Sequence, residues 1–166
     1  PVLYVCENNL YGIGTRIDRS TAVLDQYKRV SGYNIPSAQE DGQDVEQVYK
    51  AATRAIKHVR SGKGPYFLEL MTYRYRGHSM SDSNAYRGKA EERMWSGRDP
   101  VIMLRDRLID AGKLTLEQFK NMDTEILDEI EDDVIRFAAE SPEPPVSEVE
   151  KYVLAENDPW VRGGVQ

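Results

Sequence analysis

The stretch Tyr4-Val5-Cys6-Glu7-Asn8-Asn9-Leu10-Tyr11-Gly12-Ile13-Gly14 decides the fold class of this chain. It begins in an apolar run over residues 2–6, which has the length of a buried strand, and continues into amide side chains and two closely spaced glycines. In α/β proteins, ligands bind outside the carboxyl ends of such strands. The neutral amide oxygens suit a hard cation such as Mg²⁺, and Gly12 and Gly14 let the backbone approach a phosphate group closely. Considered alone, an Asn pair after a strand is more typical of a plain turn.

The composition describes a folded domain with a charged surface. Of the 166 residues, 40% are hydrophobic and 30% are charged, and the mean hydropathy is −0.63. One domain, or slightly more than one, is therefore expected. A net charge of −6 and a pI near 5.1 argue against nucleic acid or an anionic membrane as the main partner. One cysteine and two histidines supply neither an internal disulfide nor a zinc-type ligand set.

A strand–helix–strand unit is predicted between residues 35 and 73. Residues 35–39 are expected to form the first strand, and residues 66–73, which are rich in aromatic and apolar side chains, the second. Between them Asp44 is placed to cap a helix, with Gln47 reaching back as its partner. The helix carries one apolar stripe, formed by Val45, Val48, Tyr49, Ala52, Ala55, Ile56 and Val59. This order predicts a βαβ unit and therefore a parallel sheet.

Residues 74–90 lose this periodicity and are predicted to form a long polar loop. Loops of this length are uncommon in compact domains and are often functional. His78 is the only imidazole in the loop, and an ordinary exposed loop histidine is the alternative interpretation. The loop is expected to be ordered by pairs between Asp82, or a neighbouring carboxylate, and its arginines, Arg74, Arg76 and Arg87.

Three further helices are predicted. A short one is expected around residues 20–30, capped by Ser20 or Thr21. Asp99 and the proline after it begin the second helix, and Thr115 begins a long third one within a capping box. Acidic residues of the third helix are expected to form a solvated face. The helix ends at residues 141–145, because proline cannot continue it.

Two motifs in the chain resemble those of one enzyme family. The segment from Glu7 to Thr15 (Glu-Asn-Asn-Leu-Tyr-Gly-Ile-Gly-Thr) resembles the second half of the thiamin-diphosphate motif in alpha subunits of 2-oxo acid dehydrogenases. The segment from Thr72 to Asp82 (Thr-Tyr-Arg-Tyr-Arg-Gly-His-Ser-Met-Ser-Asp) resembles the active-site loop of the same subunits, and the pyruvate dehydrogenases are the most similar branch. The family motif opens with Gly-Asp-Gly well before the Asn pair, whereas only seven residues precede Asn8 here. The resemblance therefore covers only the C-terminal part of the subunit.

The resemblance implies a site for thiamin diphosphate and Mg²⁺. By this resemblance, the side chain of Asn9 and the backbone carbonyl of Tyr11 are metal ligands and cofactor-binding groups, while Asn8 braces the turn. His78 matches the loop histidine near the cofactor diphosphate. It is the expected catalytic residue of this chain, with a role in orienting charge and in acyl transfer to a lipoyl group. In the family, a glutamate of the beta subunit activates the cofactor, so the chain is expected to be inactive alone.

Ser79 is the candidate regulatory residue. It falls where mitochondrial members of the family carry an inhibitory phosphorylation site, and a phosphate there would repel the cofactor diphosphate. Two further family sites do not match, since Arg16 and Ala85 stand in place of serines. The hypothesis is therefore that kinase control is absent and that the chain is bacterial and cytoplasmic, with the mitochondrial matrix as the alternative.

The expected fold is a Rossmann-like α/β thiamin-diphosphate-binding fold, followed by a helical segment and an extended tail. Residues 1–91 are expected to form the C-terminal part of the cofactor-binding domain, including the active-site loop at residues 74–90. Residues 92–141 are expected to form the helical segment and residues 142–166 a docking tail. An isolated chain would leave a sheet edge uncovered, so instability or association is expected when it stands alone.

The implied function is that of an oxidoreductase in a multienzyme complex that links glycolysis to acetyl-CoA. The expected partners are the N-terminal part of the alpha subunit, the beta subunit in a heterotetramer of two alpha and two beta chains, and a lipoyl acyltransferase core. Acetoin and branched-chain 2-oxo acid dehydrogenases are alternatives. A non-catalytic interaction module that lacks the metal-binding Asp is a further one.

Overall fold

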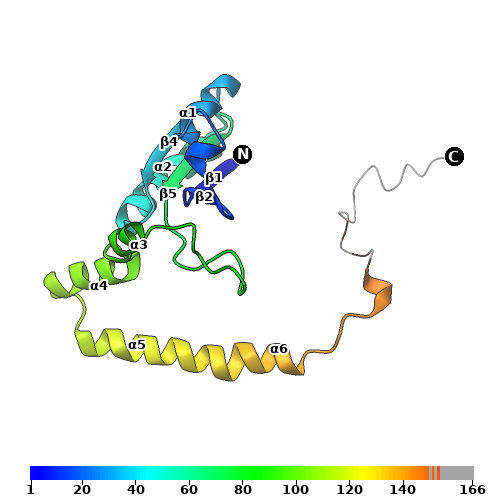
Figure 1. Cartoon of the computed structure of the whole chain (residues 1–166). Coiled ribbons are helices and arrows are strands. Elements are labelled where there is room, and N and C mark those ends of the chain that lie inside the picture. Colours follow the sequence, from blue (N-terminus) through cyan, green and yellow to red (C-terminus); the bar gives the residue numbers. More distant parts are fainter. Residues whose placement is uncertain (150, 152, 154–166) are drawn as a thin grey trace. The chain divides into compact units, whose positions relative to one another are not determined.

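The computed structural model describes residues 1–149, 151 and 153 (Figure 1). The chain divides into two compact units, Pro1–Thr115 and Leu116–Gln166. Within the described residues, no helix is long and apolar enough to cross a membrane.

The first unit is built on a parallel sheet of three strands, β1 (Leu3–Asn8), β5 (Tyr66–Met71) and β4 (Ser37–Asp41), in the order β1-β5-β4. The parallel α/β sheet predicted from the sequence is confirmed. In the register of the sheet, Met71 of β5 lies between Asn8 of β1 and Asp41 of β4. All three carboxyl ends therefore meet at one edge, where ligands bind in α/β proteins.

Two helical connections cover opposite faces of this sheet. α1 (Gln26–Arg29), which continues as a 3₁₀ turn at Val30–Tyr33, lies between β1 and β4, and α2 (Val45–Arg60) lies between β4 and β5. Because β5 is the middle strand, the two crossovers run in opposite directions, and right-handed connections then place the helices on opposite faces. The side chains of β5 agree with this, since Leu68 packs with Ala51 of α2 while Glu69 accepts hydrogen bonds from the first residues of α1.

The ends of these helices show which local predictions hold. Asp44 caps α2 as predicted, because its Oδ1 accepts from the backbone N–H groups of Glu46 and Gln47 at 3.1 and 3.2 Å. The cap predicted for the short helix is wrong, since α1 begins at Gln26 after Asp25. The hydroxyl of Ser20 donates instead to the Ile17 carbonyl, where it closes the preceding 3₁₀ turn, Ile17–Arg19.

Two more helices pack within the first unit. α3 (Lys89–Ser96) begins before the predicted end of the loop, and α4 (Pro100–Asp110) begins with Asp99 as its cap, as predicted. Arg107 of α4 donates to both carboxylate oxygens of Asp44, at 3.0 and 2.7 Å. This bidentate pair joins α4 to the first turn of α2 and holds the pKa of Asp44 well below its usual range.

The second unit is mainly one helical rod, drawn in yellow and orange in Figure 1. α5 (Leu116–Glu129) runs through a π-helical stretch, Ile130–Ile135, into α6 (Arg136–Glu140), and Ser141 before Pro142 is extended, as the proline pattern predicts. A 3₁₀ turn follows at Val146–Glu148. The prediction that residues 142–166 form a docking tail falls largely on residues 150, 152 and 154–166, which lie outside the described residues.

Candidate functional site

The segment after β1 forms a tight hairpin held by its own amide side chains. Strands β2 (Tyr11–Gly12) and β3 (Thr15–Arg16) pair in antiparallel fashion. The side-chain oxygen of Asn8 accepts from the Leu10 N–H at 3.0 Å, and that of Asn9 accepts from the Tyr11 N–H at 3.1 Å. Asn8 therefore braces the turn as expected. The oxygen of Asn9 uses one lone pair for this bond and retains a second for another ligand.

Two residues of this hairpin adopt the left-handed backbone region. Leu10 has a φ of 69° and Ile13 a φ of 55°. For a β-branched residue this conformation costs about 1–3 kcal/mol and is found chiefly where the surrounding structure imposes it, as at ligand sites. The space beside the predicted glycines differs: among the described residues a Cβ at Gly12 would meet no atom within 4 Å, whereas one at Gly14 would lie 3.7 Å from the ring of Tyr86. Gly12 thus leaves open space beside the loop.

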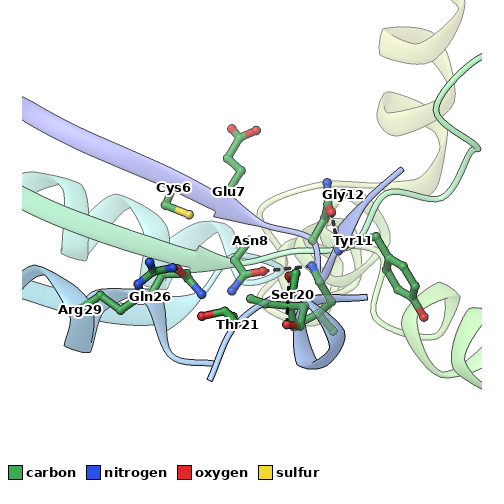
Figure 2. A pocket seen from close by; sticks show the side chains of 12 residues that line it. Cys6, Glu7, Asn8, Tyr11, Gly12, Ser20, Thr21, Gln26 and Arg29 are labelled. Carbon is green, nitrogen blue, oxygen red and sulfur yellow. Dashed lines mark hydrogen bonds between the residues drawn. The ribbon is translucent and has the colours of Figure 1, made fainter. Parts of the chain in front are cut away.

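A cavity of about 340 Å³ lies at the carboxyl end of β1 (Figure 2). Figure 2 shows Asn8 in the middle of the residues that line the cavity, with Gln26 and Arg29 on one side and Thr21 below. The cavity wall also includes Gly12. Its lining residues are mainly polar and include amide, hydroxyl and guanidinium side chains, together with the carboxylate residue Glu7.

The long loop after β5 is organised by Asp82. Its carboxylate accepts from the His78 N–H at 2.7 Å, from the Asn84 N–H at 2.9 Å and from the Tyr86 hydroxyl at 2.7 Å. These three donors lower the pKa of Asp82 to about 2. A Cβ at Gly77 would lie 2.7 Å from the Asp82 carbonyl oxygen, so this close turn needs glycine.

The predicted pairing of the loop arginines with Asp82 is not what the structure shows. The short Asp82 side chain lies inside its own turn, where backbone N–H groups reach it first. Arg74 donates to the His78 carbonyl at 3.1 Å, and Arg87 donates to the Arg74 carbonyl. Arg74 and Arg87 therefore bind backbone carbonyl groups of the loop.

Arg87 occupies an aromatic cage that sequence reasoning missed. It is only 6% exposed, and its guanidinium carbon lies 5.0 Å from the ring centre of Tyr11, 5.1 Å from that of Tyr73 and 5.6 Å from that of Tyr86. Tyr73 in turn stacks on Trp95, with ring centres 5.5 Å apart. The cage joins the hairpin, the end of β5 and α3. The tyrosine-rich motifs around both loops were the signal that could have indicated it.

A small cavity lined in part by residues of this cage brings together the three residues predicted for the cofactor site. Asn9, Tyr11 and His78 line one small cavity of about 30 Å³, together with Ile13, Arg74, Tyr86 and Arg87. Within the part of the chain that the structure describes, the Nε atom of Arg87 is buried without a hydrogen-bond partner. Two guanidinium groups, one imidazole and one amide thus surround a slot that fits a few atoms of an anionic ligand. The positive charge and N–H donors of this set suit the charge of a phosphate group.

The remaining predicted residue, Ser79, lies exposed next to this cavity-lining segment. Its hydroxyl is 3.0 Å from that of Ser81. Among the residues that the structure describes, no group of three or more His, Cys, Asp or Glu side chains is arranged to hold a metal ion. The metal donors predicted in this chain, Asn9 and Tyr11, are neutral oxygens.

Comparison with known proteins identifies relatives over nearly the whole chain. The family described as "Dehydrogenase E1 component" matches residues 1–147. The chain is 46% identical over 155 residues to the pyruvate dehydrogenase E1 component subunit alpha of Rhizobium meliloti (strain 1021), covering 93% of this chain and 44% of the relative. It is 42% identical over 169 residues to the somatic mitochondrial form from Homo sapiens, covering 100% of this chain and 43% of the relative. The chain therefore spans less than half the length of these relatives.

Proposed function

This chain belongs to the dehydrogenase E1 component family, and we propose that it is the C-terminal part of the alpha subunit of a pyruvate dehydrogenase. The complete enzyme would decarboxylate pyruvate oxidatively and transfer the acetyl group to a lipoyl group. The observation that carries the proposal is the shared cavity of Asn9, Tyr11 and His78, because two motifs far apart in the sequence meet there. The alpha-subunit relatives support the choice of pyruvate.

The proposed roles follow from the atoms that each residue offers. The side-chain oxygen of Asn9 and the carbonyl oxygen of Tyr11 would hold Mg²⁺, which prefers oxygen ligands in octahedral geometry. His78, Arg74 and Arg87 would balance the negative charge of the diphosphate. Thiamin diphosphate, when bound, supplies the reactive carbon for the decarboxylation. His78 would also orient charge during acyl transfer, since it lies exposed on the loop.

The site requires groups from other chain segments. The anionic metal ligand of the Gly-Asp-Gly motif would come from the preceding part of the alpha subunit, and the glutamate that activates the cofactor from a beta subunit. The proposed assembly is a heterotetramer of two alpha and two beta chains that delivers acetyl groups to a lipoyl acyltransferase core. The bacterial relative favours a bacterial cytoplasm, and the human relative keeps the mitochondrial matrix as the alternative.

The proposed organisation assigns cofactor binding to residues 1–91, with the active-site loop at residues 74–90. Residues 92–141 would form the helical segment and residues 142–166 the docking tail. α3 and α4 lie within the compact unit Pro1–Thr115, and the Arg107–Asp44 pair ties α4 to α2. Part of the helical segment would therefore support the cofactor-binding domain directly.

The test is a calorimetric titration of thiamin diphosphate with Mg²⁺. It uses the chain alone and the chain together with the preceding alpha-subunit segment and a beta subunit. Binding only with the partners supports a site completed by other segments, and assays with pyruvate, acetoin and branched 2-oxo acids then decide the substrate. Tight binding by the chain alone contradicts the need for an external Asp. Binding in neither sample favours the interaction module.

Variants sharpen this test in the assembled enzyme. Asn9→Ala should weaken Mg²⁺-dependent cofactor binding at least tenfold, because a coordinated oxygen is lost. His78→Asn should lower acyl transfer while the cofactor remains bound. His58→Asn is the matched control, since this histidine packs on Tyr66, with ring centres 5.4 Å apart, and does not line the shared cavity. Equal effects of the two histidine variants would contradict the assignment of His78.

A further inference from the structure

Glu69 is a carboxylate buried in the middle of the central strand. Its exposure is 0%, and it lies on the face of β5 that α1 covers, between Leu68 and Leu70, which face α2. Burying such a group is costly unless hydrogen bonds compensate for the lost water. The burial of a carboxylate here therefore depends on the groups that bond to it.

Four N–H donors surround the two oxygens of Glu69. Oε1 accepts from the Asn8 side-chain amide at 2.6 Å and from the Gln26 N–H at 3.2 Å. Oε2 accepts from the Tyr27 N–H at 2.9 Å and from the Gln39 side-chain amide at 3.1 Å. These donors come from the end of β1, the start of α1 and the middle of β4. An acceptor-only carboxylate matches all four, whereas an amide side chain would turn a donor toward at least one of them.

The bond to Asn8 leads directly to the ligand hairpin. With its nitrogen held by Glu69, the Asn8 amide points its oxygen at the Leu10 N–H, 3.0 Å away. Leu10 is held in the left-handed region by this turn, and the next bond of the same kind, from Tyr11 to Asn9, follows at 3.1 Å. These hydrogen bonds thus lead from one buried carboxylate to the two residues whose oxygens are the proposed metal ligands.

We propose that Glu69 is a positioning residue for the metal and diphosphate site, and that it acts through the Asn8 amide. The inference rests on the proposed function, since it concerns the same Asn9 and Tyr11. Glu69 does not touch the ligand itself. It fixes the orientation of the Asn8 side-chain amide, and the Asn8 amide fixes the backbone conformation of the hairpin.

The competing explanation is that Glu69 only holds α1 and β4 to the sheet. In that case its replacement would lower stability without any particular dependence on Asn8. If it acts through Asn8, the effects of the two replacements on cofactor affinity should overlap. A double-mutant cycle separates these cases, because independent sites add and coupled ones do not.

The experiment uses the complete enzyme that carries this chain, in four forms: wild type, Glu69→Gln, Asn8→Ala and the double variant. The dissociation constant for thiamin diphosphate with Mg²⁺ is measured by quenching of tryptophan fluorescence, which needs no turnover. Each single variant should weaken binding roughly tenfold, the size expected when a hydrogen bond to a buried charged group is lost. The double variant should bind the cofactor no more weakly than the single variant with the lower affinity. In all variants, kcat at saturating cofactor should change less than about twofold.

A second readout is independent of the cofactor. Amide hydrogen exchange in a peptide covering residues 7–14 should become faster in Glu69→Gln, while a peptide from the C-terminal half of α2 should not change. Glu40→Gln is the matched control. It also replaces a carboxylate of the sheet, but Glu40 bonds to Arg54 of α2 and has no bond to the hairpin. Its affinity and hairpin exchange should equal those of the wild type.

Several outcomes would overturn the inference. Additive losses in the double variant would show that Glu69 does not act through Asn8, and wild-type affinity in Glu69→Gln would show that it does not act on the site at all. If Glu69→Gln is not recovered as folded enzyme, the affinity of Asn8→Ala tests the inference. Wild-type affinity in that variant would contradict it, because Glu69 is proposed to act on the hairpin through the Asn8 amide. If the wild-type enzyme binds no cofactor, the proposed function and this inference are both wrong. If the wild type binds the cofactor and Glu69→Gln binds it equally well, only the inference is wrong.

Discussion

The hydroxyl of Tyr11 donates a hydrogen bond to the Glu91 carboxylate across 2.8 Å, and so joins the hairpin after β1 to the first turn of α3. The ring of the same tyrosine packs against Tyr86, with centres 5.7 Å apart. Tyr11 therefore connects two segments: its backbone lies in the hairpin after β1, and its side chain reaches the segment that follows the loop after β5.

Replacement of Tyr11 by Phe removes this hydrogen bond and keeps the ring in place. We expect faster hydrogen exchange in residues 84–91, corresponding to a loss of about 0.5–1.5 kcal/mol in local opening free energy. Tyr49→Phe is the control, since Tyr49 is 73% exposed. Unchanged exchange in Tyr11→Phe would mean that the aromatic contact alone holds the two segments together.

Replacement of Arg87 by Lys keeps the charge and removes the planar guanidinium group. A planar guanidinium can stack on the three rings of the cage, which a compact ammonium group cannot, and the bond to the Arg74 carbonyl comes from a guanidinium nitrogen. We expect faster cleavage by protease within residues 77–86. Arg93→Lys, on the exposed side of α3, should leave the cleavage rate unchanged. A loop equally resistant in both variants would show that positive charge is sufficient at position 87.

The order of the long loop after β5 should depend on pH through Asp82. Its folded pKa, about 2, lies below the ordinary value of 3.8. A depressed pKa means that the stabilisation is fully present above about pH 4 and is lost as the pH falls through about 2. Hydrogen exchange of the His78 amide, corrected for its intrinsic rate, should therefore show that the loop opens as the pH falls from about 4 to about 2. Asp82→Asn should show an open loop at neutral pH, and a midpoint near pH 4 in the wild type would contradict the three-donor arrangement.

Gly42 should tolerate no side chain. A Cβ there would lie 2.5 Å from the Thr72 side chain and 2.8 Å from the Met71 carbonyl oxygen, at the edge where β4 and β5 end. Gly42→Ala should lower the free energy of unfolding by about 1–3 kcal/mol, the usual cost of forced overpacking. Gly32→Ala is the control, because its Cβ would meet no atom within 4 Å. Equal melting temperatures of the two variants would disprove the close packing at Gly42.

The sequence by itself determined the local elements of this protein. The apolar stripe of residues 45–59 predicted α2, and Asp44 and Asp99 marked the starts of two helices, because these signals lie in neighbouring residues and depend on helix periodicity and capping. Asn9, Tyr11 and His78 were identified by motifs of consecutive residues. The cap predicted at Ser20 or Thr21 failed because α1 begins only at Gln26, and both hydroxyl groups bond within the preceding turns, Ser20 to the Ile17 carbonyl and Thr21 with Val23.

Only the tertiary structure decided which of these residues meet. The strand order places Asn8 beside Met71, and so the hairpin and the long loop after β5 begin at neighbouring points of one sheet edge. The Asn8–Glu69 bond joins residues 61 positions apart, and the Tyr11–Glu91 bond joins residues 80 positions apart. No local propensity encodes such contacts, because they exist only once the crossovers have set the order of the strands. The cage of Arg87 and the burial of Glu69 therefore follow from chain topology and packing.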